Sequence, residues 1–173
     1  MSSVAVIVPC YNEASRLDGD AFVGYAVTRP DVSFVFVNDG SADDTLAVLT
    51  RLAGAMPRAR VIDQQPNGGK AMAVWRGLNE ALAADTADQV AYWDADLATP
   101  LDDIDLMHTI LDERPDVDVV LGSRVQLLGR EIRRSSARHY LGRVFATCAS
   151  GVLRLPVYDT QCGAKMFRVN DSL

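Results

Sequence analysis

Short apolar runs alternate with amphipathic segments as far as residue 121, and this alternation limits the possible folds more than any other feature. The apolar runs are rich in β-branched and aromatic residues and mostly lack polar alternation, as expected of strands covered on both faces. They predict strands at residues 4–8, 34–37, 60–62, 90–93 and 117–121. The segments between them predict helices at residues 14–28, 43–55, 70–84 and 101–114, the last beginning at Thr99-Pro100.

This order of elements predicts an α/β fold with a Rossmann-like, mostly parallel sheet flanked by helices and right-handed crossovers. After residue 124 the pattern changes to a longer helical stretch at 133–152 and a strand near 165–169. A chain of 173 residues that is 49% hydrophobic can bury a core without disulfides or metals, which excludes a disordered protein. No repeat or linker interrupts it, so we expect one domain over residues 1–173.

The net charge of -6 excludes a general nucleic-acid-binding protein, whose contact face is basic. One stretch, residues 124–143, departs from this balance with six arginines and Glu131 as its one acidic residue. Such a strip indicates either a local site for an anionic partner or an ordinary solvated helix face. Within it, Arg130, Arg134 and Arg138 recur every four residues and would share one face of a helix.

Three cysteines, none paired at metal-site spacing, argue against a disulfide scaffold or a zinc site and favour a reducing compartment. Cys10 and Cys148 lie in apolar runs and are expected to be small core residues. We see no signal peptide and no apolar run of about 20 residues that could span a membrane. The sequence therefore predicts a cytoplasmic protein.

Polar side chains follow each predicted strand, and in α/β sheets these carboxyl ends meet at one edge, where ligands bind. The Asp94-Ala95-Asp96 sequence places two carboxylates at positions i and i+2, which point the same way at a strand end. Such oxygen ligands suit Mg²⁺ or Mn²⁺ bridged to substrate phosphates. The alternative is a pair of helix-capping aspartates. No dinucleotide-binding or P-loop motif follows the first strand, so a bound diphosphate needs this kind of counter-charge.

Two other loops contribute to that edge. Asp39 follows the second strand and could accept hydrogen bonds from a base or a ribose, although Ser41 or Asp43 there could simply cap the next helix. Lys70 follows two glycines at a helix start, which favours an anion, although an ordinary turn is the alternative. Other polar or apolar patterns carry structural interpretations. We expect His108 and His139 to be structural or exposed, and Met72, Trp75 and Leu78 to pack in the core.

The loop sequences together resemble glycosyltransferase family 2, which has the GT-A fold. The resemblance rests on residues 8–13 (VPCYNE), 37–45 (VNDGSADDT), 67–70 (NGGK), 94–96 (DAD) and 122–124 (GSR), in that order. Residues 159–168 (DTQCGAKMFR) are similar to the motif of dolichyl-phosphate glucosyltransferases and their prokaryotic polyprenyl-phosphate relatives. Ala98 is closer to the glucosyl than to the mannosyl enzymes, and Ala164 replaces a large aromatic residue. Members usually continue into more helices and membrane segments, so we expect a shortened or partial member.

The resemblance implies a metal-dependent, inverting hexosyltransferase that uses a nucleoside-diphosphate sugar, with UDP-glucose preferred. It implies a lipid-phosphate acceptor at the cytoplasmic face of a membrane, where the protein would be peripheral. By this resemblance, the residues expected to bind the nucleotide sugar are Pro9, Tyr11, Glu13, Asp39, Lys70 and Asp94. Metal binding falls to Asp94 and Asp96, acceptor-phosphate binding to Arg124, Arg134 and Arg138, and the catalytic set is Asp94, Asp96, Arg124 and Asp159.

Arginines suit a site for the acceptor phosphate, because a guanidinium can bind two phosphate oxygens at once. An acceptor phosphate is already anionic and needs no strong base. Asp159 could act as a base if the acceptor is a hydroxyl instead. Two alternatives therefore stay open at this point: a transferase acting on a saccharide hydroxyl, and a non-catalytic nucleotide-sugar-binding module. A nucleotidyltransferase is disfavoured because no G-x-G-x-R follows the first strand.

Overall fold

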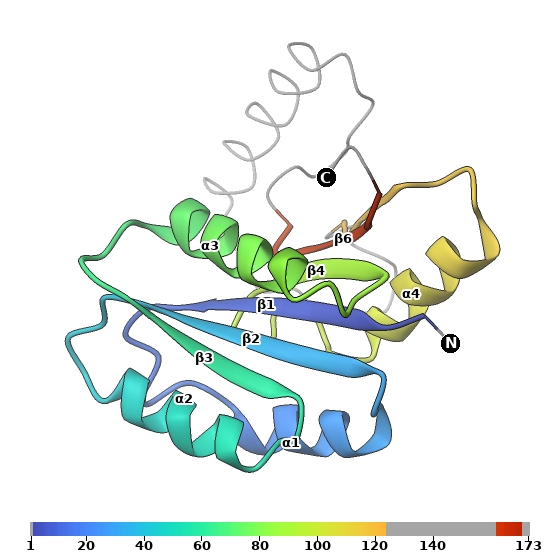
Figure 1. Cartoon of the computed structure of the whole chain (residues 1–173). Helices are drawn as coiled ribbons and strands as arrows, with labels where there is room; N and C mark the ends of the chain where they lie inside the picture. The colour runs from blue at the N-terminus through green and yellow to red at the C-terminus, as the bar shows by residue number, and fades with distance from the viewer. Residues whose placement is uncertain (1, 124–161, 171–173) are drawn as a thin grey trace, which may run out of the picture. The chain divides into compact units, whose positions relative to one another are not determined.

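A computed structural model describes residues 2–123 and 162–170 of the chain (Figure 1). Its elements, in chain order, are β1 (Val4–Cys10), α1 (Gly19–Thr28), β2 (Val32–Asp39), α2 (Thr45–Gly54), β3 (Ala59–Gln64), α3 (Lys70–Ala83), β4 (Gln89–Trp93), α4 (Asp103–Glu113), β5 (Val119–Leu121) and β6 (Ala164–Arg168). The expected alternation of strands and helices is confirmed. Among the described elements, no helix is both long enough and apolar enough to cross a bilayer.

The six strands form one sheet in the order β3-β2-β1-β4-β6-β5. β1 pairs in parallel with β2 and β4, and β2 pairs in parallel with β3. β6 runs antiparallel to β4, so the prediction of a mostly parallel sheet is confirmed. The chain divides into one compact unit of residues 1–120 and 164–173 and a second of 121–163. The first unit contains the sheet apart from the last residue of β5, and the expectation of a single domain stays a prediction.

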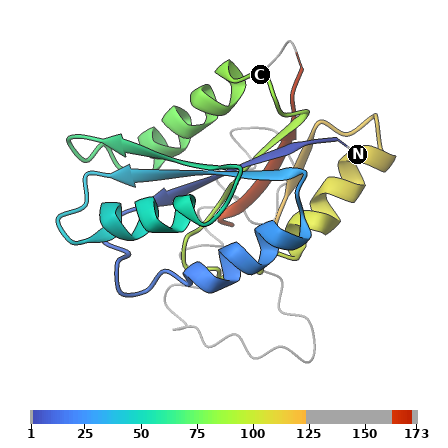
Figure 2. The same cartoon turned by 60° about the horizontal axis from the view of Figure 1, so that its bottom comes forward.

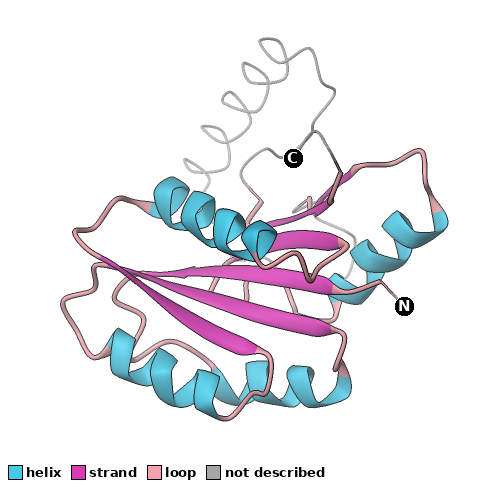
Figure 3. Cartoon of the chain, in the orientation of Figure 1, coloured by secondary structure: helices cyan, strands magenta, loops and turns pink. Residues whose placement is uncertain are grey.

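Helix α3 covers one face of the sheet, and small residues allow it to lie close to the strands (Figure 3). Its buried side is formed by Ala73, Gly77 and Ala81. A Cβ atom on Gly77 would lie 2.5 Å from Cγ2 of Ile7 in β1, so no larger residue fits at this crossing. This contact turns Met72 and Trp75 outward, with 48% and 59% of their surfaces exposed.

The interpretation of Met72 and Trp75 as core residues is therefore wrong, although Leu78 is partly buried against the core. The segment is helical as predicted, but its buried stripe is the neighbouring one, which is made of alanine and glycine. Hydrophobicity alone favoured the larger side chains, whereas the short distance between helix and sheet excludes them.

The opposite face carries α1 and α2 (Figure 2). Phe22 of α1 packs edge-on against Phe34 and Phe36 of β2, with ring centroids 5.4 and 5.3 Å away. Tyr25 of α1 donates a 2.6 Å hydrogen bond to Asp105 of α4, which joins these two helices. The aromatic run in β2 thus supplies the core beneath α1.

His108 of α4 is buried, and its Nδ1 lies 3.0 Å from Oε1 of Gln89 at the start of β4. This contact confirms its structural interpretation, whereas His139 lies outside the described residues. Cys10 is buried as expected, and Cys148 also lies outside the described residues. Burial raises the pKa of the Cys10 thiol well above its usual range, so the thiol is a packing group rather than a nucleophile.

Several element boundaries differ from the sequence prediction near the carboxyl edge of the sheet. α1 begins at Gly19, five residues later than expected, because residues 14–16 form a turn held by other loops. α4 begins at Asp103, and Thr99-Pro100 lies in the preceding turn, where the Thr99 carbonyl accepts a 2.8 Å bond from the Trp93 indole. The long-range hydrogen bonds to the Ala14 amide, which local propensity does not contain, explain the later start of α1.

Candidate functional site

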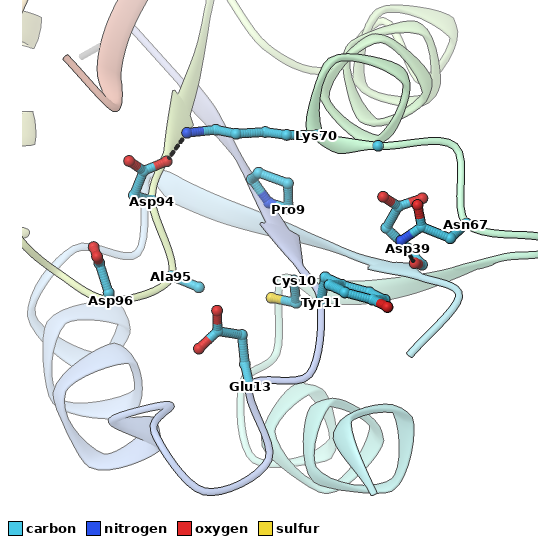
Figure 4. A pocket seen from close by; sticks show the side chains of 11 residues that line it. Pro9, Cys10, Tyr11, Glu13, Asp39, Asn67, Lys70, Asp94, Ala95 and Asp96 are labelled. Atoms are coloured by element: carbon cyan, nitrogen blue, oxygen red, sulfur yellow. Dashed lines mark hydrogen bonds and ion pairs between the residues drawn. The ribbon is translucent and has the colours of Figure 1, made fainter. Parts of the chain in front are cut away.

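A cavity of about 440 Å³ opens at the carboxyl ends of the parallel strands (Figure 4). β1 lies between β2 and β4 in the sheet, and the connections from these strands leave in different directions, which is where α/β sheets bind ligands. Its lining residues are Pro9, Cys10, Tyr11, Glu13, Asp39, Asn67, Gly69, Lys70, Asp94, Ala95 and Asp96. All six residues predicted for nucleotide-sugar binding and both predicted metal ligands are thus brought together.

One side of the cavity is built around Asp39, the last residue of β2, which is 3% exposed. Its Oδ1 accepts hydrogen bonds from the Gln64 side chain at 2.6 Å and from the Gly68 amide at 2.7 Å. Its carbonyl accepts a third, from the Asn67 side chain at 2.7 Å. Within the described part of the chain, Oδ2 makes no hydrogen bond, so one acceptor oxygen remains for a ligand.

Gly40 allows this arrangement. Its φ of 63° lies in the left-handed region, and a Cβ atom there would lie 2.5 Å from the Asn67 backbone nitrogen. Gln64 and Asn67 were not assigned a role from the sequence. Gln64 ends β3, two residues beyond the strand predicted at 60–62, and polar residues shortly after a predicted strand are the signal that could have identified it.

The loop after β1 is held by side chains that precede and begin α2. Ser41 Oγ accepts the Asn12 amide at 3.0 Å, and Thr45 Oγ1 accepts the amides of Glu13 and Ala14 at 2.8 and 3.1 Å. Asp43 accepts the Ala14 amide as well, at 3.2 Å. The hydrogen bond from the Thr45 hydroxyl is the main cause that lowers the pKa of Asp43.

Asp43 also accepts the Thr45 amide at 3.0 Å, so it serves the start of α2 while joining two loops. The residue at the N-cap position is Asp44, and its side chain makes no capping bond. Ser41 and Asp43, for which the sequence offered helix capping as an alternative, therefore mainly hold the loop that follows β1. No local pattern in the sequence indicates a bond between residues about 30 positions apart.

Glu13 is presented to the cavity by this clamped loop (Figure 4). Its Oε1 pairs with Arg16 at 2.7 Å, while its Oε2 is buried and has no hydrogen-bond partner in the described structure. A buried carboxylate oxygen without a partner is costly, which makes this atom a candidate for contact with a ligand, an ion or a water molecule.

Asp94 and Asp96 lie on the other side of the cavity from Asp39 (Figure 4). β4 ends at Trp93, and a turn follows in which the Leu97 amide bonds to the Asp94 carbonyl at 3.3 Å. The i, i+2 argument for a strand end is therefore wrong in its geometry, since the two aspartates are in a turn. Both nonetheless line the cavity.

The two aspartates differ in their partners. Oδ1 of Asp94 forms an ion pair with Nζ of Lys70, which begins α3. Oδ1 of Asp96 accepts the Ala98 amide at 3.1 Å. The remaining carboxylate oxygens, Oδ2 of each, form no hydrogen bond to the described residues.

The donor set fits a hard divalent cation. Among the described residues no group of three or more His, Cys, Asp or Glu side chains is placed to hold a metal ion. Mg²⁺ and Mn²⁺ are commonly held by one or two carboxylates and complete their coordination with water and substrate phosphates. The two carboxylates of Asp94 and Asp96 in the cavity lining match that pattern rather than a closed protein cage.

The predicted acceptor residues Arg124, Arg134 and Arg138, and the predicted catalytic Asp159, lie outside the described residues. The basic strip and the helix expected at 133–152 lie there as well. These assignments stay predictions from the sequence.

A family model, Glycosyl transferase family 2, matches residues 5–171, which is nearly the whole chain. The chain belongs to this family. The match begins within β1 and extends past β6, so it includes every loop that lines the cavity.

Curated relatives in the family resemble the chain along most of its length. A dolichyl-phosphate beta-glucosyltransferase of Trichomonas vaginalis is 31% identical, and the match covers 93% of this chain and 50% of the relative. One from Dictyostelium discoideum is 32% identical over 95% of this chain and 53% of its own length. A prophage bactoprenol glucosyl transferase homolog of Escherichia coli is 30% identical over 70% of this chain and 39% of its own length. The chain spans about half the length of the dolichyl-phosphate relatives.

Solved structures confirm the fold. A mannosyltransferase of Pyrobaculum calidifontis, in complex with GDP-Man and Mn²⁺, is 25% identical with a TM-score of 0.61, covering 96% of this chain and 44% of that one. Glucosyl-3-phosphoglycerate synthase of Mycobacterium tuberculosis has a TM-score of 0.66 at 19% identity, covering 96% of this chain and 57% of that one. The GT-A-type architecture expected from the sequence is therefore confirmed.

Proposed function

We propose that this chain forms the nucleotide-sugar-binding part of an inverting transferase that moves glucose from UDP-glucose to a polyprenyl or dolichyl phosphate. The observation that carries the proposal is the arrangement of carboxylates in the cavity. Asp39, which is held by hydrogen bonds, lies on one side, and Asp94 and Asp96 lie on the other. The curated relatives named as glucosyltransferases of lipid phosphates support the choice of sugar and acceptor.

At the first side, Oδ2 of Asp39 accepts a hydrogen bond from an N–H of the base, because Oδ1 is already held by Gln64 and Gly68. Pro9 and Tyr11 line the cavity between the two sides and contact the base and ribose. Oε2 of Glu13, which has no partner among the described residues, accepts a hydrogen bond from a ribose hydroxyl or from a water molecule bound to the ligand.

At the second side, Asp94 and Asp96 hold Mg²⁺ or Mn²⁺, as the Mn²⁺ in the related mannosyltransferase complex supports. When bound, the cation offsets the negative charge that develops on the departing diphosphate. The acceptor phosphate oxygen attacks the anomeric carbon from the opposite face, the bond to the diphosphate breaks, and UDP leaves with the electron pair. Because the acceptor is already anionic, the described residues need to supply position and charge rather than a strong base.

The acceptor half of the proposal concerns Arg124, Arg134, Arg138 and Asp159, and it rests on the sequence alone. It places the basic strip against the lipid phosphate at the cytoplasmic surface of a membrane, with bidentate guanidinium contacts. Arg134→Ala should then weaken binding of the acceptor phosphate and leave the affinity for the donor sugar nucleotide unchanged.

Calorimetric titration of the protein with UDP and GDP, with and without Mn²⁺, tests the donor site. We expect UDP to bind more tightly with Mn²⁺ and Asp96→Asn to abolish that metal-dependent gain while leaving the metal-independent affinity. An unchanged Mn²⁺ effect in Asp96→Asn would refute the metal assignment. Transfer from UDP-glucose to a short polyprenyl phosphate tests the reaction, and UDP-glucose binding without transfer or hydrolysis would indicate a binding module instead.

A further inference from the structure

Lys70 is the one cationic residue among the described residues that line the cavity, whereas four of the lining residues carry carboxylates. The carboxylates belong to Glu13, Asp39, Asp94 and Asp96. An anionic diphosphate would be repelled by this excess of negative charge unless cations offset it. How Lys70 is used therefore bears directly on substrate binding.

In this structure Lys70 is already engaged, because its Nζ forms an ion pair with Oδ1 of Asp94 (Figure 4). The pair is partly open to solvent, with side-chain exposures of 53% for Lys70 and 31% for Asp94. An ammonium that contacts Asp94 and a divalent cation that Asp94 ligates repel each other strongly at such short range. The two positive groups thus compete for the same carboxylate.

A lysine displaced from Asp94 stays close to the site because of its surroundings. Its Nζ lies 5.9 Å from the centre of the Tyr92 ring, within the range of a cation–π contact. That ring is also occupied by Lys165 of β6, whose Nζ is 4.8 Å from the ring centre and donates to the Tyr92 hydroxyl. A second ammonium on the same ring disfavours Tyr92 as the final partner of Lys70, and an anion in the cavity is the better one.

We propose that Lys70 exchanges partners on substrate binding. It pairs with Asp94 while the cavity holds no substrate, and it turns to the diphosphate when a divalent cation takes Asp94. The lysine therefore offsets the charge of Asp94 before the cation binds. Afterwards it contributes a second positive charge next to the diphosphate of the donor. This inference rests on the proposed function, because it requires the cation and the nucleotide to meet at Asp94.

Lys70→Met tests the exchange, since it removes the charged Nζ and keeps an unbranched side chain of nearly the same length. Mn²⁺ alone, measured by calorimetry without nucleotide, should bind about two- to fivefold more tightly, the range expected when a partly exposed ion pair no longer competes. UDP at saturating Mn²⁺ should bind about tenfold more weakly, because a charged contact to the diphosphate is lost. The two affinities thus change in opposite directions.

Two matched variants separate this exchange from a general charge effect. Arg76→Met removes an exposed positive charge from the same helix, away from the cavity lining, and should change both affinities by less than about twofold. Lys70→Arg keeps the charge and should restore most of the UDP affinity. An equal gain in Mn²⁺ affinity for Arg76→Met and Lys70→Met would overturn the exchange.

Failure of the exchange and failure of the proposed function give different results. If Asp94→Asn weakens Mn²⁺ binding but Lys70→Met leaves it unchanged, the exchange is wrong and the metal assignment stands. If Asp94→Asn leaves Mn²⁺ binding unchanged, the metal assignment is wrong, and the exchange is wrong with it.

Discussion

Thr45 holds the loop that carries Glu13, and Thr45→Val is the substitution whose effect follows most directly from the structure. The residue is 1% exposed, and its hydroxyl accepts the amides of Glu13 and Ala14. Valine keeps the branched shape but offers no acceptor. The Ala14 amide keeps Asp43 as a partner at 3.2 Å, whereas the Glu13 amide loses the hydrogen bond that the structure gives it.

One partly buried amide left without an acceptor costs about 1–3 kcal/mol in the free energy of unfolding. With a urea m-value of about 2 kcal/mol/M, the midpoint of urea unfolding should fall by about 0.5–1.5 M at constant m. Nucleotide affinity should fall as well, because the position of Glu13 depends on this loop.

Thr50→Val on the same helix is the control, because the Thr50 hydroxyl donates to the Leu46 carbonyl at an exposed position. The free energy of unfolding of Thr50→Val should differ from that of the unmodified protein by no more than about 0.5 kcal/mol. Thr45→Ser keeps the acceptor and should retain nucleotide affinity. A loss in Thr45→Val no larger than in Thr50→Val would refute the role of Thr45 as a clamp.

Three further outcomes are expected. Asp39→Asn can keep the bonds from Gln64 and Gly68 through its oxygen but turns the second acceptor into a donor, so UDP affinity in calorimetry should fall about 10- to 100-fold, equally with and without Mn²⁺. Trp75→Gln should change unfolding free energy by less than about 0.5 kcal/mol, whereas Gly77→Val should destabilise by about 1–3 kcal/mol or more in urea unfolding. The hydrogen bond from Arg29 lowers the pKa of Asp31, so its stabilisation is present above the unfolded value of 3.8 and is lost as pH falls below it. Asp31→Asn should flatten the decline in urea midpoint over that acidic range.

The sequence by itself determined the class of fold and the edge of the sheet at which the cavity opens. Short apolar runs separated by amphipathic segments leave few alternatives to a parallel sheet with helices on its faces. Since the carboxyl ends of such strands meet, polar residues after each run, such as Asp39 and Asp94, had to lie at one site. For the same reason, the error in the local geometry of Asp96 did not affect its placement at the cavity.

The tertiary structure decided which atoms of those residues are free and which are used. Thr45 holds the loop that carries Glu13, Lys70 forms an ion pair with Asp94, and Gln64 donates a hydrogen bond to Asp39. Each of these contacts joins segments that are distant in sequence. It also decided that alanine and glycine, rather than Met72 and Trp75, face the sheet from α3. Periodicity reports which side chains share a face, but the distance between helix and sheet selects the face that is buried. That distance depends on the packing of the whole fold, which no local pattern contains.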